Sequence, residues 1–261
     1  MNVAILFEDD DVLVLNKPSG VTVNTSDTTT GEETLQNFVE TYRHLPPYVR
    51  PEKVREEKES GEKVFKTPEQ EFTDRAGIVH RLDKETSGVI LVAKNVHSFR
   101  DLQSQFKQRS VEKKYVALSH GLIKPEIGEI NVPVGRLPWN RKQFGVIADG
   151  REAQTLYKLV QKYTLTIAGK KENLSFVELT PKTGRTHQIR VHLKYIGYPI
   201  FADFLYAGRK TARNDRKLLT RVFLHAGTIT FDHPTNKTRL TFEAPLPEEL
   251  QKVLQLCSIL E

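Results

Sequence analysis

The sequence predicts an α+β fold with a mixed, mainly antiparallel central sheet flanked by helices. Many short segments have the composition of strands, and they follow one another in the order of an antiparallel sheet. Only a few segments place apolar residues at helical spacing. Since no internal repeat is present, we expect a single domain over residues 1–261.

The strands are predicted from short apolar runs bounded by turn formers. In chain order, these runs cover residues 3–7, 12–16, 88–94, 113–118, 174–179, 222–231 and 238–243. The first two flank an acidic turn and form a hairpin, after which Pro18 ends the strand and presents Lys17. Residues 129–164 add half-buried antiparallel strands, because every second residue from Ala153 to Leu159 belongs to one face.

The helices are predicted from apolar residues three and four positions apart. They cover residues 33–42, 96–109, 187–196 and 247–259. In the third helix, Thr186 can cap the first turn and Gly197 can end the last one, with Pro199 just beyond. The closing helix starts at Pro247, since proline suits a first helical turn.

Two segments between these elements are rich in charge. Residues 44–76 contain four prolines among dense charges, which predicts a surface insertion. Residues 207–221 contain one acid, Asp215, and six basic residues, namely Arg209, Lys210, Arg213, Arg216, Lys217 and Arg221. Such a run is either a solvated face or a basic loop or arm for phosphates, poorly ordered without its ligand.

Charge and cysteine content narrow the class of protein. The 261 residues carry a formal net charge of +6, which favours a polyanionic partner, although many enzymes of neutral substrates are equally basic. The single cysteine, Cys257, cannot form an intramolecular disulfide. The N-terminus lacks the basic region of a signal peptide, and no apolar run approaches the about 18 residues of a membrane span. We therefore expect a soluble, cytoplasmic protein.

The stretch from His80 to Gly88 holds the first candidate for chemistry. Its carboxylate, Asp83, lies in a polar and basic loop directly before the apolar strand, so the sheet would hold it in place. A carboxylate held in this way can act as a nucleophile, a general base or an electrostatic anchor. It can equally be a turn aspartate in an ordinary salt bridge.

Two other side chains could serve the same chemistry. Arg185 follows a turn at Gly184, and its guanidinium could bind the Asp83 carboxylate through two parallel hydrogen bonds, orienting it and keeping it ionised. Tyr115 heads a strand after two lysines, where its ring could stack on a base and its hydroxyl could relay a proton. The alternatives are a solvated turn arginine and a tyrosine of the core.

Two other kinds of site do not fit. His187 and His192 are five positions apart, off the spacing that shares a helix face, and the only cysteine is remote, so no metal site is predicted. A kinase catalytic loop needs an asparagine five residues after its aspartate, where this chain has Gly88.

Five motifs, in order, resemble the RluA family of RNA pseudouridine synthases. They are Asn16–Gly20, Gly77–Lys94, Lys114–Leu118, Thr183–His192 with Gly197–Ile200, and Leu224–Ala226 with Phe242–Pro247. The resemblance implies the pseudouridine synthase catalytic fold, with a cleft across the sheet. It implies cofactor-free isomerisation of uridine in a structured rRNA or tRNA stem-loop, by a monomer without an obligate protein partner. Because the chain opens on the strands of the catalytic domain, we expect no S4-like RNA-binding domain before them.

The resemblance also implies roles for residues. Asp83 would be the nucleophile on a flipped-out base, attacking C1′ or C6 or assisting glycal formation, and Arg185 would orient its carboxylate. Tyr115 would stack on the base and could take the C5 proton. Arg81 would fill the space that the base leaves, Leu224 would pack under the ring, and other basic groups would contact phosphates. The residues expected to contact RNA are Arg81, Leu224, Arg190, His187, Lys17, Arg209, Lys210 and Arg213.

Two other functions stay open. A catalytically silent RNA-binding or RNA-folding protein could keep this fold, although the three catalytic candidates are all present. A glycosidase or nucleoside hydrolase would need two carboxylates across the scissile bond and would release free uracil. Glu85 is the only nearby candidate for the second carboxylate.

Overall fold

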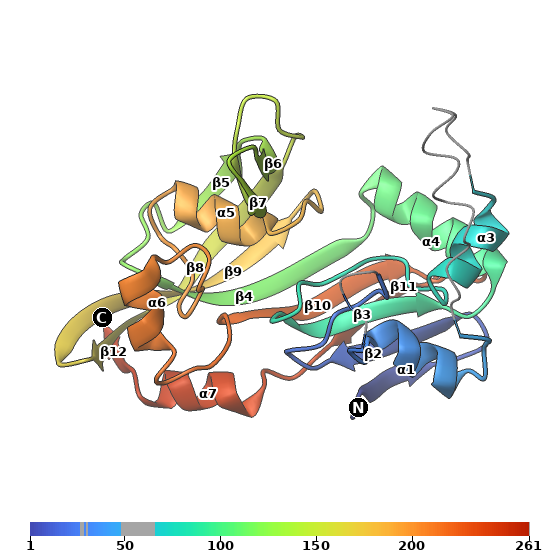
Figure 1. The fold of residues 1–261 in the computed structure, drawn as a ribbon, viewed down its shortest axis with the longest axis horizontal. Coiled ribbons are helices and arrows are strands. Elements are labelled where there is room, and N and C mark those ends of the chain that lie inside the picture. The colour runs from blue at the N-terminus through green and yellow to red at the C-terminus, as the bar shows by residue number, and fades with distance from the viewer. Residues whose placement is uncertain (27–28, 30, 48–65, 261) are drawn as a thin grey trace.

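The computed structural model describes residues 1–26, 29, 31–47 and 66–260. In this part of the chain, a sheet of ten strands runs along the length of the molecule (Figure 1). The strands pair in the order β1-β2-β3-β10-β4-β9-β8-β12, while β11 pairs with β10 and β5 with β8; β6 and β7 form a separate hairpin. The bounds are β1 (Ala4–Glu8), β2 (Val12–Lys17), β3 (Ser87–Ala93), β4 (Glu112–His120), β5 (Ile127–Asn131), β6 (Val134–Leu137), β7 (Asn140–Val146), β8 (Gln154–Ile167), β9 (Lys170–Pro181), β10 (Leu224–Asp232), β11 (Arg239–Glu243) and β12 (Ser258–Leu260).

The helices divide between the two halves of this sheet (Figure 1). Those beside β1–β3 are α1 (Leu35–Tyr42), α3 (Pro68–Asp74) and α4 (Val96–Gln108). Those at the other half are α5 (Gln188–Tyr195), α6 (Arg209–Asp215) and α7 (Glu248–Gln255). Among the described strands, β3 and β10 form the only parallel pair, so the predicted mixed, mainly antiparallel sheet is confirmed.

The strand β3 is apolar from Val89 to Ala93 because the sheet is covered on both faces here. Alternate side chains of a strand point to opposite faces. Ile90 and Val92 pack in the cluster that contains Leu35 of α1, whereas Val89 and Leu91 pack with residues of α4. All of β3 is buried, so the loop before it is anchored at its end to a rigid strand.

Gly88 sets how closely the loop before β3 approaches β10. Its φ is +121°, and an added Cβ would lie 2.1 Å from the carbonyl oxygen of Ala226. Only glycine fits this backbone conformation and this distance. Since Ser87 and Gly88 pair with His225 and Ala226, the end of the His80–Gly88 loop is pressed against β10.

Three local predictions are wrong. Residues 207–221 are not a disordered arm, because they contain α6 and because Asp215 and Arg221 are buried. The closing helix ends at Gln255, since the residues after it pair with β8 as β12. The residue at the N-cap of α5 is His187 rather than Thr186, and no side chain caps this helix.

The predicted insertion at residues 44–76 is described only in part, because residues 48–65 lie outside the described residues. Its last portion forms α3, which begins with a capping box between Thr67 and Gln70. Phe72 of this helix meets Phe99 of α4 edge to face, with ring centroids 5.7 Å apart. No helix in the described part of the chain is long and apolar enough to cross a membrane.

Candidate active site

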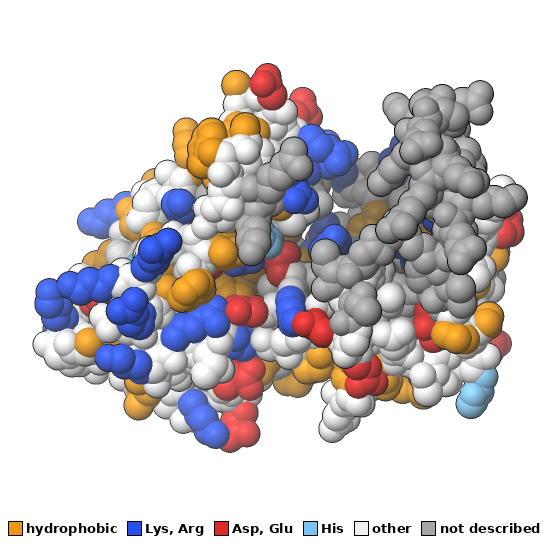
Figure 2. All heavy atoms as spheres, in the orientation of Figure 1, with side chains coloured by type: hydrophobic (Ala, Val, Ile, Leu, Met, Phe, Trp, Pro, Cys, Tyr) orange, Lys and Arg blue, Asp and Glu red, His pale blue; other side chains and the backbone are white. Residues whose placement is uncertain are grey.

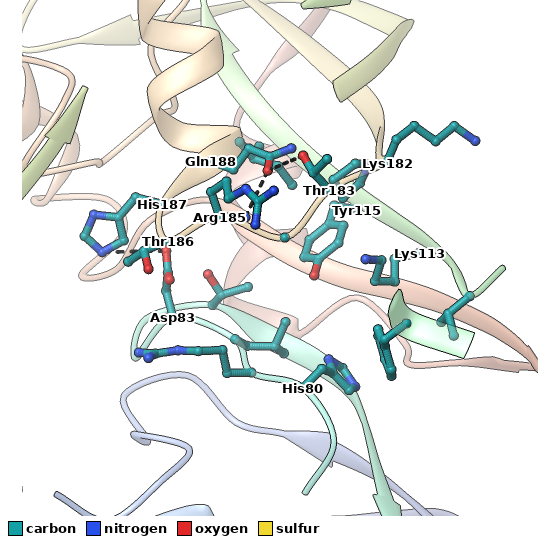
Figure 3. Close-up of a pocket in the computed structure, with 18 of the residues that line it drawn as sticks. His80, Asp83, Lys113, Tyr115, Lys182, Thr183, Arg185, Thr186, His187 and Gln188 are labelled. Atoms are coloured by element: carbon teal, nitrogen blue, oxygen red, sulfur yellow. Dashed lines mark hydrogen bonds and ion pairs between the residues drawn. The ribbon is translucent and has the colours of Figure 1, made fainter. Parts of the chain in front are cut away.

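A cavity of about 540 Å³ lies where the loop before β3, the start of β4 and the turn before α5 meet (Figure 3). Among its described lining residues, nine are lysines or arginines, and Asp83 is the only carboxylate. A basic cavity concentrates polyanions, and its walls raise the local potential further. Of the predicted site residues, the cavity brings together Arg81, Asp83, Tyr115, Arg185, His187, Arg190 and Leu224.

Asp83 is held at the rim of this cavity by its loop. The carbonyl of Asp83 accepts the N–H of Thr86 at 3.0 Å, which closes a turn directly after it. The loop is tied to the turn after β2, since Gly20 N–H donates to Lys84 O at 2.8 Å and Ser19 Oγ donates to Glu85 O at 2.7 Å. The backbone on both sides of Asp83 is therefore fixed, while its side chain stays 19% exposed.

Arg190 is the arginine that pairs with Asp83. Its Nη1 lies 3.2 Å from Asp83 Oδ2, and its Nε and Nη2 bind the two oxygens of Asp203 at 2.8 and 2.9 Å. Arg190 thus spans two carboxylates, with 7% of the residue exposed. Its predicted phosphate contact stays a prediction, because two of its five N–H groups are not used in these bonds and it lines the cavity.

Arg185 does not contact Asp83 in the structure, contrary to the predicted pairing. Its Nε donates to the carbonyl of Glu152 at 2.9 Å, and its backbone N–H donates to Gln188 Oε1 at 3.0 Å. Arg185 lies in the turn before α5, so its side chain extends along the cavity wall toward β8. Arg190 lies within α5, three positions after His187, and positions three apart share a helix face. No pattern along the chain marks Arg190 rather than Arg185 as the partner of Asp83, since Asp83 and Arg190 are 107 positions apart.

Tyr115 and Leu224 form the wall beside Asp83. Tyr115 lies on β4, and Figure 3 shows its hydroxyl pointing into the cavity. Burial, together with the charge of Asp83, raises the pKa of this phenol above its usual value, so the hydroxyl is neutral. Leu224 begins the neighbouring strand β10 and is 3% exposed. Arg81 is exposed and lines the same cavity, as predicted for a residue that contacts RNA.

Lys17 is completely buried, so its predicted contact with a phosphate is wrong. Its Nζ donates to the carbonyls of Pro18 and Val21 at 2.8 Å each and to that of Lys84 at 3.2 Å. Lys17 thus ties the turn after β2 to the loop of Asp83. Burial and the charge of Arg221 lower the pKa of Lys17 to about 7, against the opposing charge of Asp83.

This lowered pKa predicts a pH dependence that Lys17→Met removes. Between about pH 7 and the usual lysine value of 10.5, the unfolded chain binds a proton that the folded protein lacks. The free energy of unfolding of the wild type therefore rises with pH across this window, by up to about 1.4 kcal/mol per pH unit, relative to Lys17→Met. Urea unfolding of both proteins at pH 7 and pH 9 measures this difference. If the free energy of unfolding changes with pH by the same amount in the two proteins, the pKa of Lys17 is not lowered.

The exposed cations of α6 lie outside the cavity. Arg209, Lys210 and Arg213 are exposed on this helix, and Figure 2 shows lysines and arginines gathered over this end of the molecule. The helix is joined to the loop before β3 through Arg216, whose Nη2 lies 2.7 Å from Glu85 Oε2.

Glu85 is occupied by this contact, since its Oε2 also accepts the N–H of Val222 at 2.9 Å. It is absent from the described lining of the cavity. The pair of carboxylates that a hydrolase needs is therefore not formed by Asp83 and Glu85. Among the described residues, no group of three or more His, Cys, Asp or Glu is arranged to hold a metal ion.

Comparison with known proteins places this site in a family. Residues 11–195 match the family model described as RNA pseudouridylate synthase. The chain is 35% identical over 258 residues to the uncharacterized RNA pseudouridine synthase YlyB of Bacillus subtilis, covering 98% of this chain and 73% of that protein. It is 35% identical over 251 residues to ribosomal large subunit pseudouridine synthase C of Vibrio parahaemolyticus, covering 96% of this chain and 68% of the relative. The structure of human RNA pseudouridylate synthase domain containing 1 is similar, with a TM-score of 0.65 and 25% identity, covering 97% of this chain and 94% of the human chain.

Proposed function

The chain belongs to the RNA pseudouridine synthase family, and on that premise we propose that Asp83 is the nucleophile with which it isomerises uridine in RNA. One observation carries this proposal. Asp83 is the only carboxylate among the described residues that line a basic cavity, and Arg190 Nη1 donates to its Oδ2 at 3.2 Å.

The size of the cavity supports a single extruded nucleoside as its occupant. Its volume of about 540 Å³ lies within the range of about 300–1,000 Å³ for pockets that enclose small molecules. A base within a duplex must leave its stack to reach such a site. We propose that the target uridine flips out and that Arg81, which is exposed at the rim, fills the space it leaves.

The reaction detaches uracil from C1′, turns it and joins C5 to C1′. The geometry supports Asp83 as the attacking group at C1′ or C6, or as the base of a glycal route, and these routes share the same residues. Leu224 and Tyr115 both line the cavity, and we propose that Leu224 packs under the ring and Tyr115 beside it. Because Tyr115 is neutral, its oxygen can receive the C5 proton only while it passes its own proton on.

The proposed substrate is a structured rRNA or tRNA stem-loop. The name of the Vibrio relative, a ribosomal large subunit pseudouridine synthase, supports rRNA. Pseudouridine mapping across the transcriptome tests this, in a deletion strain complemented with wild type or with Asp83→Asn. Sites restored by the wild type alone identify the RNA. If no site changes, the protein is a silent RNA binder, and release of free uracil would indicate a hydrolase. Action in the cytoplasm, as a monomer, is part of the same proposal.

We expect the exposed cations of α6 to contribute phosphate contacts outside the cavity. Replacing Arg209, Lys210 and Arg213 with glutamine should weaken RNA binding and flatten the dependence of log K on log salt by up to about 2–3, since each neutralised phosphate contributes about 0.7–0.9 to the slope. Filter binding over a range of salt concentrations measures this slope, and the single-turnover rate at saturating RNA should change little.

The matched control neutralises three exposed lysines that do not line the cavity, namely Lys124, Lys158 and Lys252. The same loss of charge there should leave the salt dependence nearly unchanged. Equal slopes for the α6 variant and the wild type would mean that the cations of α6 form a solvated face and do not contact phosphates.

A further inference from the structure

His187 lies between Asp83 and a buried tyrosine that the reaction described above does not use. Its Nε2 is 3.9 Å from Asp83 Oδ2, and its Nδ1 is 2.8 Å from the hydroxyl of Tyr206. Figure 3 shows the imidazole beside the carboxylate at the edge of the cavity. Each ring nitrogen therefore faces a different group, and the tautomer decides which of them receives a proton.

The hydroxyl of Tyr206 decides the tautomer. It accepts the backbone N–H of Phe144 at 3.1 Å. Among the described residues, its only other hydrogen-bond partner is His187 Nδ1. Tyr206 is 4% exposed, so its proton needs a partner within the protein, and Nδ1 is the acceptor available. An imidazole that accepts at Nδ1 carries its own proton at Nε2, facing Asp83.

Both rings are locked in place. The Arg190 guanidinium lies over the Tyr206 ring, 5.0 Å from its centroid. Asp203 Oδ1 accepts the backbone N–H of Tyr206 at 3.2 Å. On the other side, the ring of Phe144 meets His187 edge to face, with centroids 5.5 Å apart. Arg190, which pairs with Asp83, thus also holds the ring of Tyr206 in place beside His187.

We propose that Tyr206 is a positioning residue that keeps His187 in its Nε2–H tautomer, so that His187 donates a hydrogen bond to a carbonyl oxygen of the uracil ring. This rests on the proposed function. When the C1′–N1 bond breaks, its electron pair stays on uracil and spreads onto the carbonyl oxygens. When a carboxylate oxygen adds to C6, the C5–C6 π pair moves onto C5 and O4. Negative charge therefore develops on the ring by each route, and a fixed N–H donor stabilises it.

The neutral form of the ring agrees with its surroundings. Burial lowers the pKa of His187, while the charge of Asp83 opposes this and that of Arg190 adds to it. Its left-handed backbone, with φ of 57°, suits histidine and asparagine better than most residues. His187→Asn therefore keeps the backbone conformation, and its side-chain carbonyl can still accept the Tyr206 proton, but it removes the donor at the Nε2 position.

Nuclear magnetic resonance of the imidazole nitrogens tests the tautomer without any RNA. In the wild type we expect a protonated Nε2 and an unprotonated Nδ1 for His187, assigned by the loss of these signals in His187→Asn. In Tyr206→Phe, which keeps the ring against Arg190, a second tautomer should appear. A protonated Nδ1 in the wild type, or an unchanged spectrum in Tyr206→Phe, would overturn the proposal.

Single-turnover rates at saturating RNA test the consequence. Tyr206→Phe should lower the rate about tenfold, the effect of one hydrogen bond, with little change in RNA affinity. Tyr195→Phe is the matched control, because Tyr195 is 57% exposed on α5. In the His187→Asn background, Tyr206→Phe should cause no further loss, since it acts through the imidazole. An equal loss in both backgrounds would make Tyr206 merely structural. If the wild type forms no pseudouridine, the proposed function fails, while the resonance result still decides the tautomer.

Discussion

Asp83→Asn is expected to lower the rate of pseudouridine formation by at least about 10⁴-fold, the loss expected when a nucleophile is removed. Asparagine has the same shape but is neutral and cannot form the covalent or proton-transfer step. Arg190 keeps its two bonds to Asp203, so the fold should persist. The measurement is a carbodiimide primer-extension stop on RNA from a deletion strain, treated with each protein.

The control for this variant is Asp10→Asn, an exposed position in the turn between β1 and β2. It makes the same chemical change at a residue that does not line the cavity, and it should leave every primer-extension stop in place. Binding of RNA by Asp83→Asn should stay within a few-fold of the wild type, because the basic lining is unchanged. If Asp83→Asn yields the same stops as the wild type, Asp83 is not the nucleophile.

Arg190→Met should lower the free energy of unfolding by about 3–5 kcal/mol and abolish turnover. The substitution leaves Asp203, which is fully buried, and Asp83 without their shared cation, and removing one partner of a buried pair costs about this much. Arg190→Lys keeps the charge, but a single ammonium cannot span two carboxylates. Arg190→Lys should therefore lower the free energy of unfolding less than Arg190→Met does, but it should still lower turnover strongly. Urea unfolding and single-turnover assays measure the two effects.

Arg185→Lys is the matched comparison, because it makes the same change in a second arginine that lines the cavity. Among the described residues, the Arg185 side chain binds only a backbone carbonyl. Its replacement should therefore lower the free energy of unfolding by less than about 1 kcal/mol. A greater loss of turnover in Arg185→Lys than in Arg190→Lys would restore the pairing predicted from the sequence.

The residues proposed for the chemistry are linked through one connected set of side chains. Asp83 is held by Arg190, Arg190 by Asp203, and Tyr206 by both, while His187 lies between Tyr206 and Asp83. The set joins the loop before β3 to α5 and to the turn after it. A change in any member is therefore expected to alter the others, so that losses on combining two substitutions will not be additive.

The sequence by itself determined most of the strands, the helices α1, α4, α5 and α7, and the position of the Asp83 loop, but not α3, α6 or β12. Local spacing carries this information: β3 contains a continuous apolar run from Val89 to Ala93, and α4 repeats Phe99, Leu102 and Phe106 on one face. The motif from His80 to Gly88 located the carboxylate, and the resemblance implied Tyr115 and Leu224 as its neighbours. In the structure both line the same cavity, because β4 and β10 pair.

Only the tertiary structure decided which charges meet. Asp83 and Arg190 are 107 positions apart, and no local pattern distinguishes Arg190 from Arg185 as the partner. Burial likewise separated Lys17, which binds three carbonyls of the protein, from the exposed cations of α6. The physical reason is that an ionic contact depends on a few ångströms between side chains, which the packing of α5 and the loop before β3 sets. Residue type and spacing along the chain record only that a charge is present.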